Sequence, residues 1–251
     1  MLNPSTKSRR LLLCAPSYFS RATSTIPAIT QPRRLEVERK FPINKKNVVY
    51  IASNNWETRL KGHEYLGKQT THDIYYDKEG MLFSKGVYVR QRNNKWEAKV
   101  RTGGDFTNSA FREVDGIDAV KEVIERSLGL NGGNDYRHDI EDMLTPCADF
   151  VTERDSWMLD GKFKVDVDMT DFGHSVGEVE LTSILPSNVC GSIERGKASE
   201  SKMKEKMDQE IEGFMKRYPD AFPAGRAVGK LTAYFEKFGW NVARVLQQEH
   251  L

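Results

Sequence analysis

The feature that most constrains this chain is a short stretch, residues 35–41 (LEVERKF), in which charged and apolar residues alternate. Successive side chains of a β-strand point to opposite faces, so Glu36, Glu38 and Lys40 would share one face, opposite apolar residues. Two carboxylates about 7 Å apart, from a rise of roughly 3.4 Å per residue, suit a hard divalent cation, and a nearby lysine suits an anion. One such strand is more often a solvated surface strand, so its meaning depends on whether other strands repeat the pattern.

The same alternation recurs along the chain. Further strands are predicted over residues 72–76, 87–92, 95–101, 110–114, 150–159, 163–169 and 177–181. Charged residues share a face in four of these places: Arg90/Arg92, Glu97/Lys99, Lys164/Asp166/Asp168 and Glu178/Glu180. The opposite faces are apolar and need cover, and a closed antiparallel barrel with a charged lumen and helices packed outside satisfies all of them. The sequence therefore predicts an α+β fold built around such a barrel.

Helical segments that could cover the barrel lie between and after these strands. Helical spacing or capping residues predict helices at 44–56, 118–128, 138–144, 199–218 and 230–238, and a terminal helix to about residue 248. A lumen crowded with charges of both signs is costly unless a ligand fills it. A polyanion bound together with a divalent metal would fill it, because carboxylates hold the metal while Arg and Lys hold phosphate oxygens.

Overall composition excludes several other classes of protein. The net charge of +2 gives no general basicity for nucleic-acid binding, and no apolar run approaches the roughly 20 residues that span a membrane. Cys14, Cys147 and Cys190 are far apart and match no zinc or redox spacing, so we expect a reducing compartment and no disulfide framework. With 251 residues, the chain can form one large domain or two small ones.

The first 34 residues differ from the rest of the chain. They contain no Asp or Glu, and their arginines are interleaved with Ser and Thr. This composition predicts a mitochondrial transit peptide, with a disordered Ser-rich tail on a cytoplasmic protein as the alternative. We therefore divide the chain into a leader, residues 1–34, and a barrel domain, residues 35–251.

The ordered charged motifs resemble those of a known family. Glu36-x-Glu38-x-Lys40 matches the E-x-E-x-K signature of the CYTH superfamily, also called triphosphate tunnel metalloenzymes. The motifs that follow are similar in the same order: Asp73-Ile-Tyr75-Tyr76-Asp77, Arg90-x-Arg92, Trp96-Glu97-x-Lys99, Arg112-Glu113, Arg154, Asp166-x-Asp168 and Glu178-x-Glu180. Asp171-Phe172-Gly173 and Gly229-Lys230-Leu231 make the resemblance strongest to the thiamine-triphosphatase branch.

This resemblance implies a closed eight-stranded tunnel that processes a triphosphate, with Mg²⁺ as cofactor and Mn²⁺ as an alternative. The implied metal ligands are Glu36, Glu38, Asp168, Glu178 and Glu180. The implied triphosphate ligands are Arg90, Arg92, Lys99, Arg154 and Lys230. Glu113 and Asp166 would orient these groups, and Lys40 and Tyr75 would lie near the attacking water. Tyr88 stands where mammalian members have Trp, so contacts with the organic part of the substrate are expected to differ.

The predicted function is hydrolysis of the terminal phosphate of a small-molecule triphosphate by a monomer that binds neither nucleic acid nor membrane. Thiamine triphosphate is the first candidate substrate and inorganic triphosphate the second. Two alternatives remain open, a class IV adenylyl cyclase and a non-catalytic polyphosphate-binding module. Two roles are also open for Lys40, a cation that holds phosphate or a general base, and Tyr75 is either an active-site hydroxyl or a buried aromatic residue.

Overall fold

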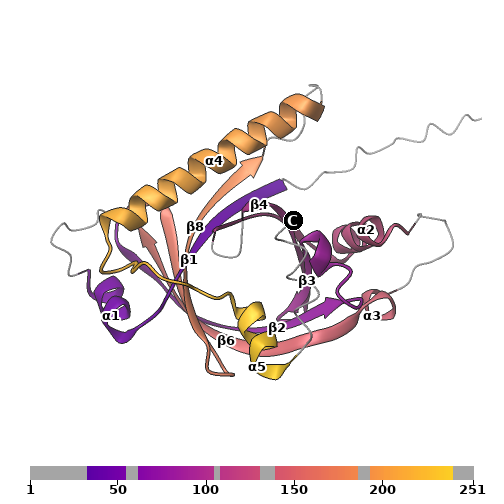
Figure 1. Ribbon diagram of the computed structural model, residues 1–251, viewed down its shortest axis with the longest axis horizontal. Helices are drawn as coiled ribbons and strands as arrows, with labels where there is room; N and C mark the ends of the chain where they lie inside the picture. The colour runs from indigo at the N-terminus through magenta and orange to yellow at the C-terminus, as the bar shows by residue number, and fades with distance from the viewer. Residues whose placement is uncertain (1–32, 55–61, 105–107, 131–138, 186–192, 240–251) are drawn as a thin grey trace, which may run out of the picture. The chain divides into compact units, whose positions relative to one another are not determined.

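Eight antiparallel strands close into a barrel, and the helices lie outside it or against its opening (Figure 1). The computed structural model describes residues 33–54, 62–104, 108–130, 139–185 and 193–239. The strands are β1 (Arg33–Phe41), β2 (Glu64–Asp77), β3 (Val87–Arg92), β4 (Lys95–Gly104), β5 (Asn108–Asp115), β6 (Thr145–Leu159), β7 (Phe163–Thr170) and β8 (Ser175–Leu185). Their order around the barrel is β1-β5-β4-β3-β2-β6-β7-β8, with β8 paired to β1. The predicted closed antiparallel barrel is confirmed.

Five α-helices and one short 3₁₀-helix accompany these strands in the described part of the chain. They are α1 (Lys45–Ser53), η1 (Phe83–Lys85), α2 (Ile117–Leu128), α3 (Ile140–Met143), α4 (Ile193–Arg217) and α5 (Lys230–Phe238). All lie in one compact unit, residues 32–251. No described helix is long and apolar enough to cross a membrane. The predicted terminal helix and nearly all of the predicted leader lie outside the described residues.

The main hydrophobic core lies on the outer face of the barrel, between the sheet and α4. Leu35, Val37 and Phe41 point outward from β1 and belong to one buried cluster with Ile211 and Phe214 of α4. In Figure 1, α4 runs along the outside of β1 and β8. Because the apolar face of β1 is covered in this way, its charged face is directed into the lumen.

Arg39 is a charged residue on the outward face of β1, where it pairs with an acidic residue of α4. It donates hydrogen bonds from Nε and Nη2 to the carboxylate of Asp208 in α4, at 2.7 and 2.8 Å. This bidentate ion pair satisfies the guanidinium at the edge of the apolar core. Arg39 therefore helps to fix α4 on the barrel, while its neighbours Glu38 and Lys40 face the lumen.

Capping residues mark the ends of two smaller helices. Asn44 caps α1 by accepting a hydrogen bond from the backbone N–H of Asn47, and α1 ends at Asn54, whose φ of 49° is left-handed. The helix is therefore slightly shorter than the predicted 44–56. Gly129 ends α2 with a φ of 71°. The apolar stripe of α2, including Val120 and Ile124, packs over the outer faces of β4 and β5.

Some elements are longer than the sequence pattern predicts. β2 begins at Glu64 instead of residue 72, and β6 begins at Thr145 instead of residue 150. The added part of β2 is largely exposed and pairs with β6 through its backbone. An exposed strand carries no apolar alternation, so periodicity could not detect it.

Candidate active site in the barrel lumen

The lumen contains a cavity of about 560 Å³. Side chains from all eight strands line it, together with residues of η1 and α5. The paired register of β1 and β8 sets Glu38 opposite Glu180 and Lys40 opposite Glu178. The alternation seen in the sequence thus places charged side chains of neighbouring strands side by side within the cavity.

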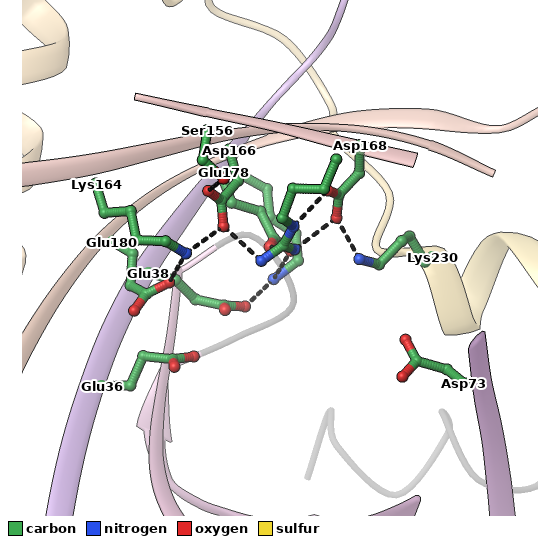
Figure 2. Close-up of polar contacts among 12 residues, drawn as sticks. Glu36, Glu38, Asp73, Ser156, Lys164, Asp166, Asp168, Glu178, Glu180 and Lys230 are labelled. Atoms are coloured by element: carbon green, nitrogen blue, oxygen red, sulfur yellow. Dashed lines mark hydrogen bonds and ion pairs between the residues drawn. The ribbon is translucent and has the colours of Figure 1, made fainter. Parts of the chain in front are cut away.

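One wall of the cavity is acidic. Glu36, Glu38, Glu178 and Glu180 all line it, and Figure 2 shows the carboxylates of β1 and β8 directed into the same space. Burial, together with nearby Glu178 and despite Lys40, raises the pKa of Glu38 above its ordinary value. Burial and the charge of Glu36 raise the pKa of Glu180 to about 7. The wall therefore concentrates negative charge that a bound cation would offset.

Two lysines face this acidic wall. Lys99 Nζ donates to Glu36 Oε1 at 2.5 Å and lies 3.2 Å from Glu113. Lys40 Nζ contacts Glu38 and lies 3.8 Å from Glu178. Burial alone would lower the pKa of each lysine, but the neighbouring carboxylates outweigh burial and raise both pKa values. Both lysines are therefore cations at neutral pH.

Arginines of β3 form a second cationic group. Arg92 donates from Nε and Nη2 to Asp73 at 2.6 and 2.7 Å, and Arg90 donates to Glu97 at 2.9 and 2.7 Å. Asp73 is fully buried; burial would raise its pKa, but Arg92 and Arg90 lower it. The Tyr75 hydroxyl accepts a hydrogen bond from Arg90 at 3.3 Å. Both guanidinium groups are thus held in fixed directions on the cavity wall.

Arg154 is the centre of a third network, whose members Asp166, Asp168 and Glu178 are labelled in Figure 2. It donates two hydrogen bonds of 2.6 Å to Asp168 and lies 2.5 Å from Asp166 and 3.2 Å from Glu178. Asp168 also contacts Lys230 of α5 and is fully buried behind the cavity lining. Asp168 was predicted as a metal ligand; in this arrangement its oxygens orient Arg154 and Lys230.

Aromatic side chains also form part of the cavity wall. Phe83, Tyr88, Phe111 and Phe235 line the cavity there. The ring of Tyr88 lies 5.5 Å from that of Phe83 and 5.9 Å from that of Phe111, between ring centroids. These residues form the aromatic wall, which is suited to an uncharged or organic part of a ligand, whereas the carboxylates and the basic side chains are suited to metal and phosphate.

The donor set fits a hard divalent cation. Four carboxylates line one wall, and the raised pKa of Glu38 and Glu180 reflects in part repulsion among them that a cation would relieve. Within the described residues no three carboxylate, His or Cys side chains already converge as a metal site. Glu36 and Glu38 are bound by Lys99 and Lys40, so those lysines would have to turn toward a phosphate for the carboxylates to bind metal.

The structure brings nearly all predicted site residues into the cavity or its supporting networks. Tyr75 both stacks on Phe150 and presents its hydroxyl to Arg90, so it is buried and also faces the site. Sequence reasoning assigned no role to Arg101, Lys164, Asp73, Phe83, Phe111 and Phe235. Continuing the alternation from Lys99 would have reached Arg101, whereas the phenylalanines carry no signal that separates them from core residues.

A closed β-tunnel with facing carboxylates, lysines and arginines defines a protein that binds a small-molecule triphosphate, and enzymes of this type generally depend on a divalent metal. Residues 34–206 match the CYTH domain family, and the chain belongs to that family.

The chain is also similar to individual members and solved structures. It is 30% identical over 183 residues to human thiamine-triphosphatase and 27% identical over 180 residues to the Macaca fascicularis enzyme. Each alignment covers 64% of this chain and 74% of the relative. A solved structure described as a putative adenylyl cyclase from Hippeastrum with a dominant triphosphatase activity is 16% identical, with a TM-score of 0.46, and the match covers 83% of this chain and 98% of that one.

Proposed function

We propose that this chain hydrolyses the terminal phosphoryl group of a small-molecule triphosphate, with thiamine triphosphate as the first candidate substrate. The observation that carries the proposal is the lumen itself, where lysines and arginines face a wall of four carboxylates. Membership of the CYTH domain family and the similarity to two thiamine-triphosphatases support it. The 560 Å³ cavity has room for a triphosphate and part of an organic group.

The chain's own residues would act by binding and orienting the reactants. Arg90, Arg92 and Arg154 are held by Glu97, Asp73 and Asp168, so their positions are set before substrate enters. Lys40, Lys99 and Lys230 add further positive charge around the phosphates. Water would attack the terminal phosphorus, the bridging P–O bond would break, and a diphosphate would leave. Such transfer depends mainly on positioning and on stabilising charge.

The proposed cofactor is Mg²⁺, with Mn²⁺ as the alternative. When bound, a divalent ion neutralises phosphate oxygens and the charge that develops on the leaving group. Glu36, Glu38, Glu178 and Glu180 are the residues that would hold it, since all four line the cavity. Asp168 would join them only if it released one of its contacts with Arg154 or Lys230.

Inorganic triphosphate is a second candidate substrate. The described ion-pair networks recognise phosphate oxygens and do not require an organic group. The similarity to two thiamine-triphosphatases gives thiamine triphosphate its place as first candidate.

Phosphate release from thiamine triphosphate, inorganic triphosphate and ATP, each with Mg²⁺, Mn²⁺ or excess EDTA, tests the proposal. We expect release that needs metal and is fastest with one of the first two compounds. Glu36→Gln and Glu38→Gln should cut turnover strongly at limiting Mg²⁺, and Arg217→Met, on the outside of α4, should not. Cyclic AMP formed from ATP would favour the cyclase, and tight binding of triphosphate without turnover would favour a binding module.

We further propose that residues 1–34 direct the protein to mitochondria, on the basis of their Arg-, Ser- and Thr-rich composition without acidic residues. A fluorescent fusion with residues 1–34 should enter mitochondria, and a fusion that starts at Leu35 should stay in the cytosol. A cytosolic signal from the first fusion would contradict the proposal.

A further inference from the structure

Arg101 lies on the aromatic wall of the cavity and is held there by aromatic groups. Its Nη2 donates a hydrogen bond to the Tyr88 hydroxyl at 2.8 Å. The centre of its guanidinium lies 5.7 Å from the ring centroid of Tyr88 and 5.5 Å from that of Phe111, which is cation–π distance. An organic cation that entered this part of the cavity would therefore meet rings that already hold a positive charge.

The backbone around Arg101 fixes the side chain in this place. Its N–H donates to the carbonyl oxygen of Gly86 at 2.8 Å, at the start of β3. A Cβ atom at Gly86 would lie only 2.9 Å from Arg101 Cβ and 3.7 Å from Cδ. Glycine at this position therefore leaves space for the aliphatic part of the Arg101 side chain. Gly86 also has a φ of 65°, which glycine adopts without strain. The path of the stem leads the guanidinium to Tyr88 and Phe111.

Arg101 adds a positive charge to the aromatic wall. The ring of Tyr88 is also in contact with Phe83. A triphosphate group, which is strongly negative, is attracted to Arg101. The thiazolium ring of thiamine carries a positive charge and is repelled by Arg101.

We infer that Arg101 is a specificity-determining residue that disfavours a cationic organic group on the aromatic wall and favours a substrate that is anionic along its whole length. This inference rests on the proposed triphosphate site. It assigns to Arg101 the discrimination between thiamine triphosphate and inorganic triphosphate, whichever of the two the wild-type protein prefers.

The test measures kcat/KM with Mg²⁺, and Kd by calorimetry without divalent metal, for thiamine triphosphate and inorganic triphosphate. We expect Arg101→Met to shift both ratios toward thiamine triphosphate by about tenfold, because one cation is removed from the rings and from the anion. Arg101→Lys keeps the charge and should stay within about threefold of wild type. ATP, whose base is uncharged, should gain less than thiamine triphosphate from Arg101→Met.

The matched control is Arg217→Met, because Arg217 also lies over two aromatic rings, Phe214 and Tyr218, at 5.9 Å from each centroid, but outside the barrel. It should leave both ratios unchanged. Equal ratios in Arg101→Met and wild type, an equal gain in Arg101→Lys, or an equal gain for ATP would each overturn the inference. A wild-type protein that turned over neither compound would contradict the proposed function, and its binding ratios would still decide the role of Arg101.

Discussion

Lys40 lies between Glu38 and Glu178, and these carboxylates raise its pKa although burial alone would lower it. A lysine that stays protonated at neutral pH can hold a phosphoryl group but cannot accept a proton from water. The environment therefore favours the phosphate-binding role over the general base.

Substitution of Lys40 separates these two roles. Lys40→Arg keeps the charge, so it should retain the rising limb of the rate against pH. Lys40→Ala should lower kcat/KM by about 10–100-fold, the value of a charged hydrogen bond to phosphate. Steady-state kinetics from pH 5 to 9 provide the measurement. A different result would make Lys40 the general base. Lys40→Arg would then bind inorganic triphosphate normally, lose about 10²–10⁴-fold in turnover and lose the rising limb of the rate against pH.

Glu180 gives a pH dependence of stability in the metal-free protein. Burial and Glu36 raise its pKa from 4.5 to about 7 in the folded protein. The folded state therefore keeps a proton that the unfolded state loses above about pH 4.5. The contribution of Glu180 to stability is greatest below that pH and is lost as the pH rises to about 7, by roughly 3 kcal/mol at most.

Glu180→Gln should remove this loss, since glutamine does not titrate. The free energy of unfolding should be measured with urea, in EDTA, at pH 5 and pH 7.5. The difference between Glu180→Gln and wild type should favour the variant more at pH 7.5 than at pH 5. Equal differences at the two pH values would show that Glu180 has an ordinary pKa.

At the residue level, the sequence indicates the charged half of the site much better than the aromatic half. A charged residue in an alternating strand stands out, and the lumen positions of Glu36, Glu38 and Glu178 follow from it. Phe83 and Phe235 come from η1 and α5, and each looks like a core residue until the barrel brings them together. Their position depends on contacts between distant segments, which periodicity does not contain.

At the level of elements, the turn between β7 and β8 holds α5 against the barrel. The ring of Phe172 contacts Phe150, Tyr234 and Phe238, with centroid distances of 5.4, 5.5 and 6.2 Å. The ring nitrogen Nε2 of His174 lies 2.8 Å from the carbonyl oxygen of Val228, just before α5. The Asp171-Phe172-Gly173 motif thus supports the helix that carries Lys230 into the site.

Phe172→Ala should loosen α5 without opening the barrel. Loss of these ring contacts should lower the free energy of local opening of α5 by about 2 kcal/mol, which is somewhat less than the cost of replacing a fully buried Phe by Ala. Hydrogen exchange of the α5 backbone amides would report this change. Because Lys230 would be less well positioned, kcat/KM should fall toward that of Lys230→Ala, and the double variant should lose little more. Unchanged exchange in α5, or fully additive losses, would show that the turn does not position Lys230.

Strands with one buried apolar face show alternating apolar and charged residues in the sequence, and these strands were predicted well. Strands without such a face were predicted poorly. β1, β3 and β7 each have one face on a core and one in the lumen, and their predicted positions agree closely with the structure. The first half of β2 is exposed and is held by its pairing with β6. Pairing between strands far apart in sequence leaves no local trace, so these additional residues could only be found in the folded chain.

In the whole barrel, the usual arrangement of a β-barrel interior is reversed. The apolar core lies outside the sheet under α4 and α2, and the lumen contains buried Glu38, Asp73, Arg90, Asp166, Asp168 and Lys230. Paired buried charges contribute little net stability, because desolvation offsets much of their attraction. The lumen is therefore organised for a ligand, and a matching ligand should stabilise the whole fold.

Inorganic triphosphate with Mg²⁺ should raise the thermal midpoint of the full-length protein. At a ligand concentration 100 times Kd the gain is about 2.7 kcal/mol, which corresponds to roughly 5–10 °C for a domain of this size. Differential scanning fluorimetry provides the measurement, with sulfate at equal ionic strength as the ligand control and Arg90→Met as the site control. Arg90→Met should lose most of the shift because Arg90 is one of the fixed phosphate-binding groups, whereas Arg217→Met should keep it. An equal shift with sulfate, or in Arg90→Met, would mean that the lumen does not distinguish a triphosphate from other anions.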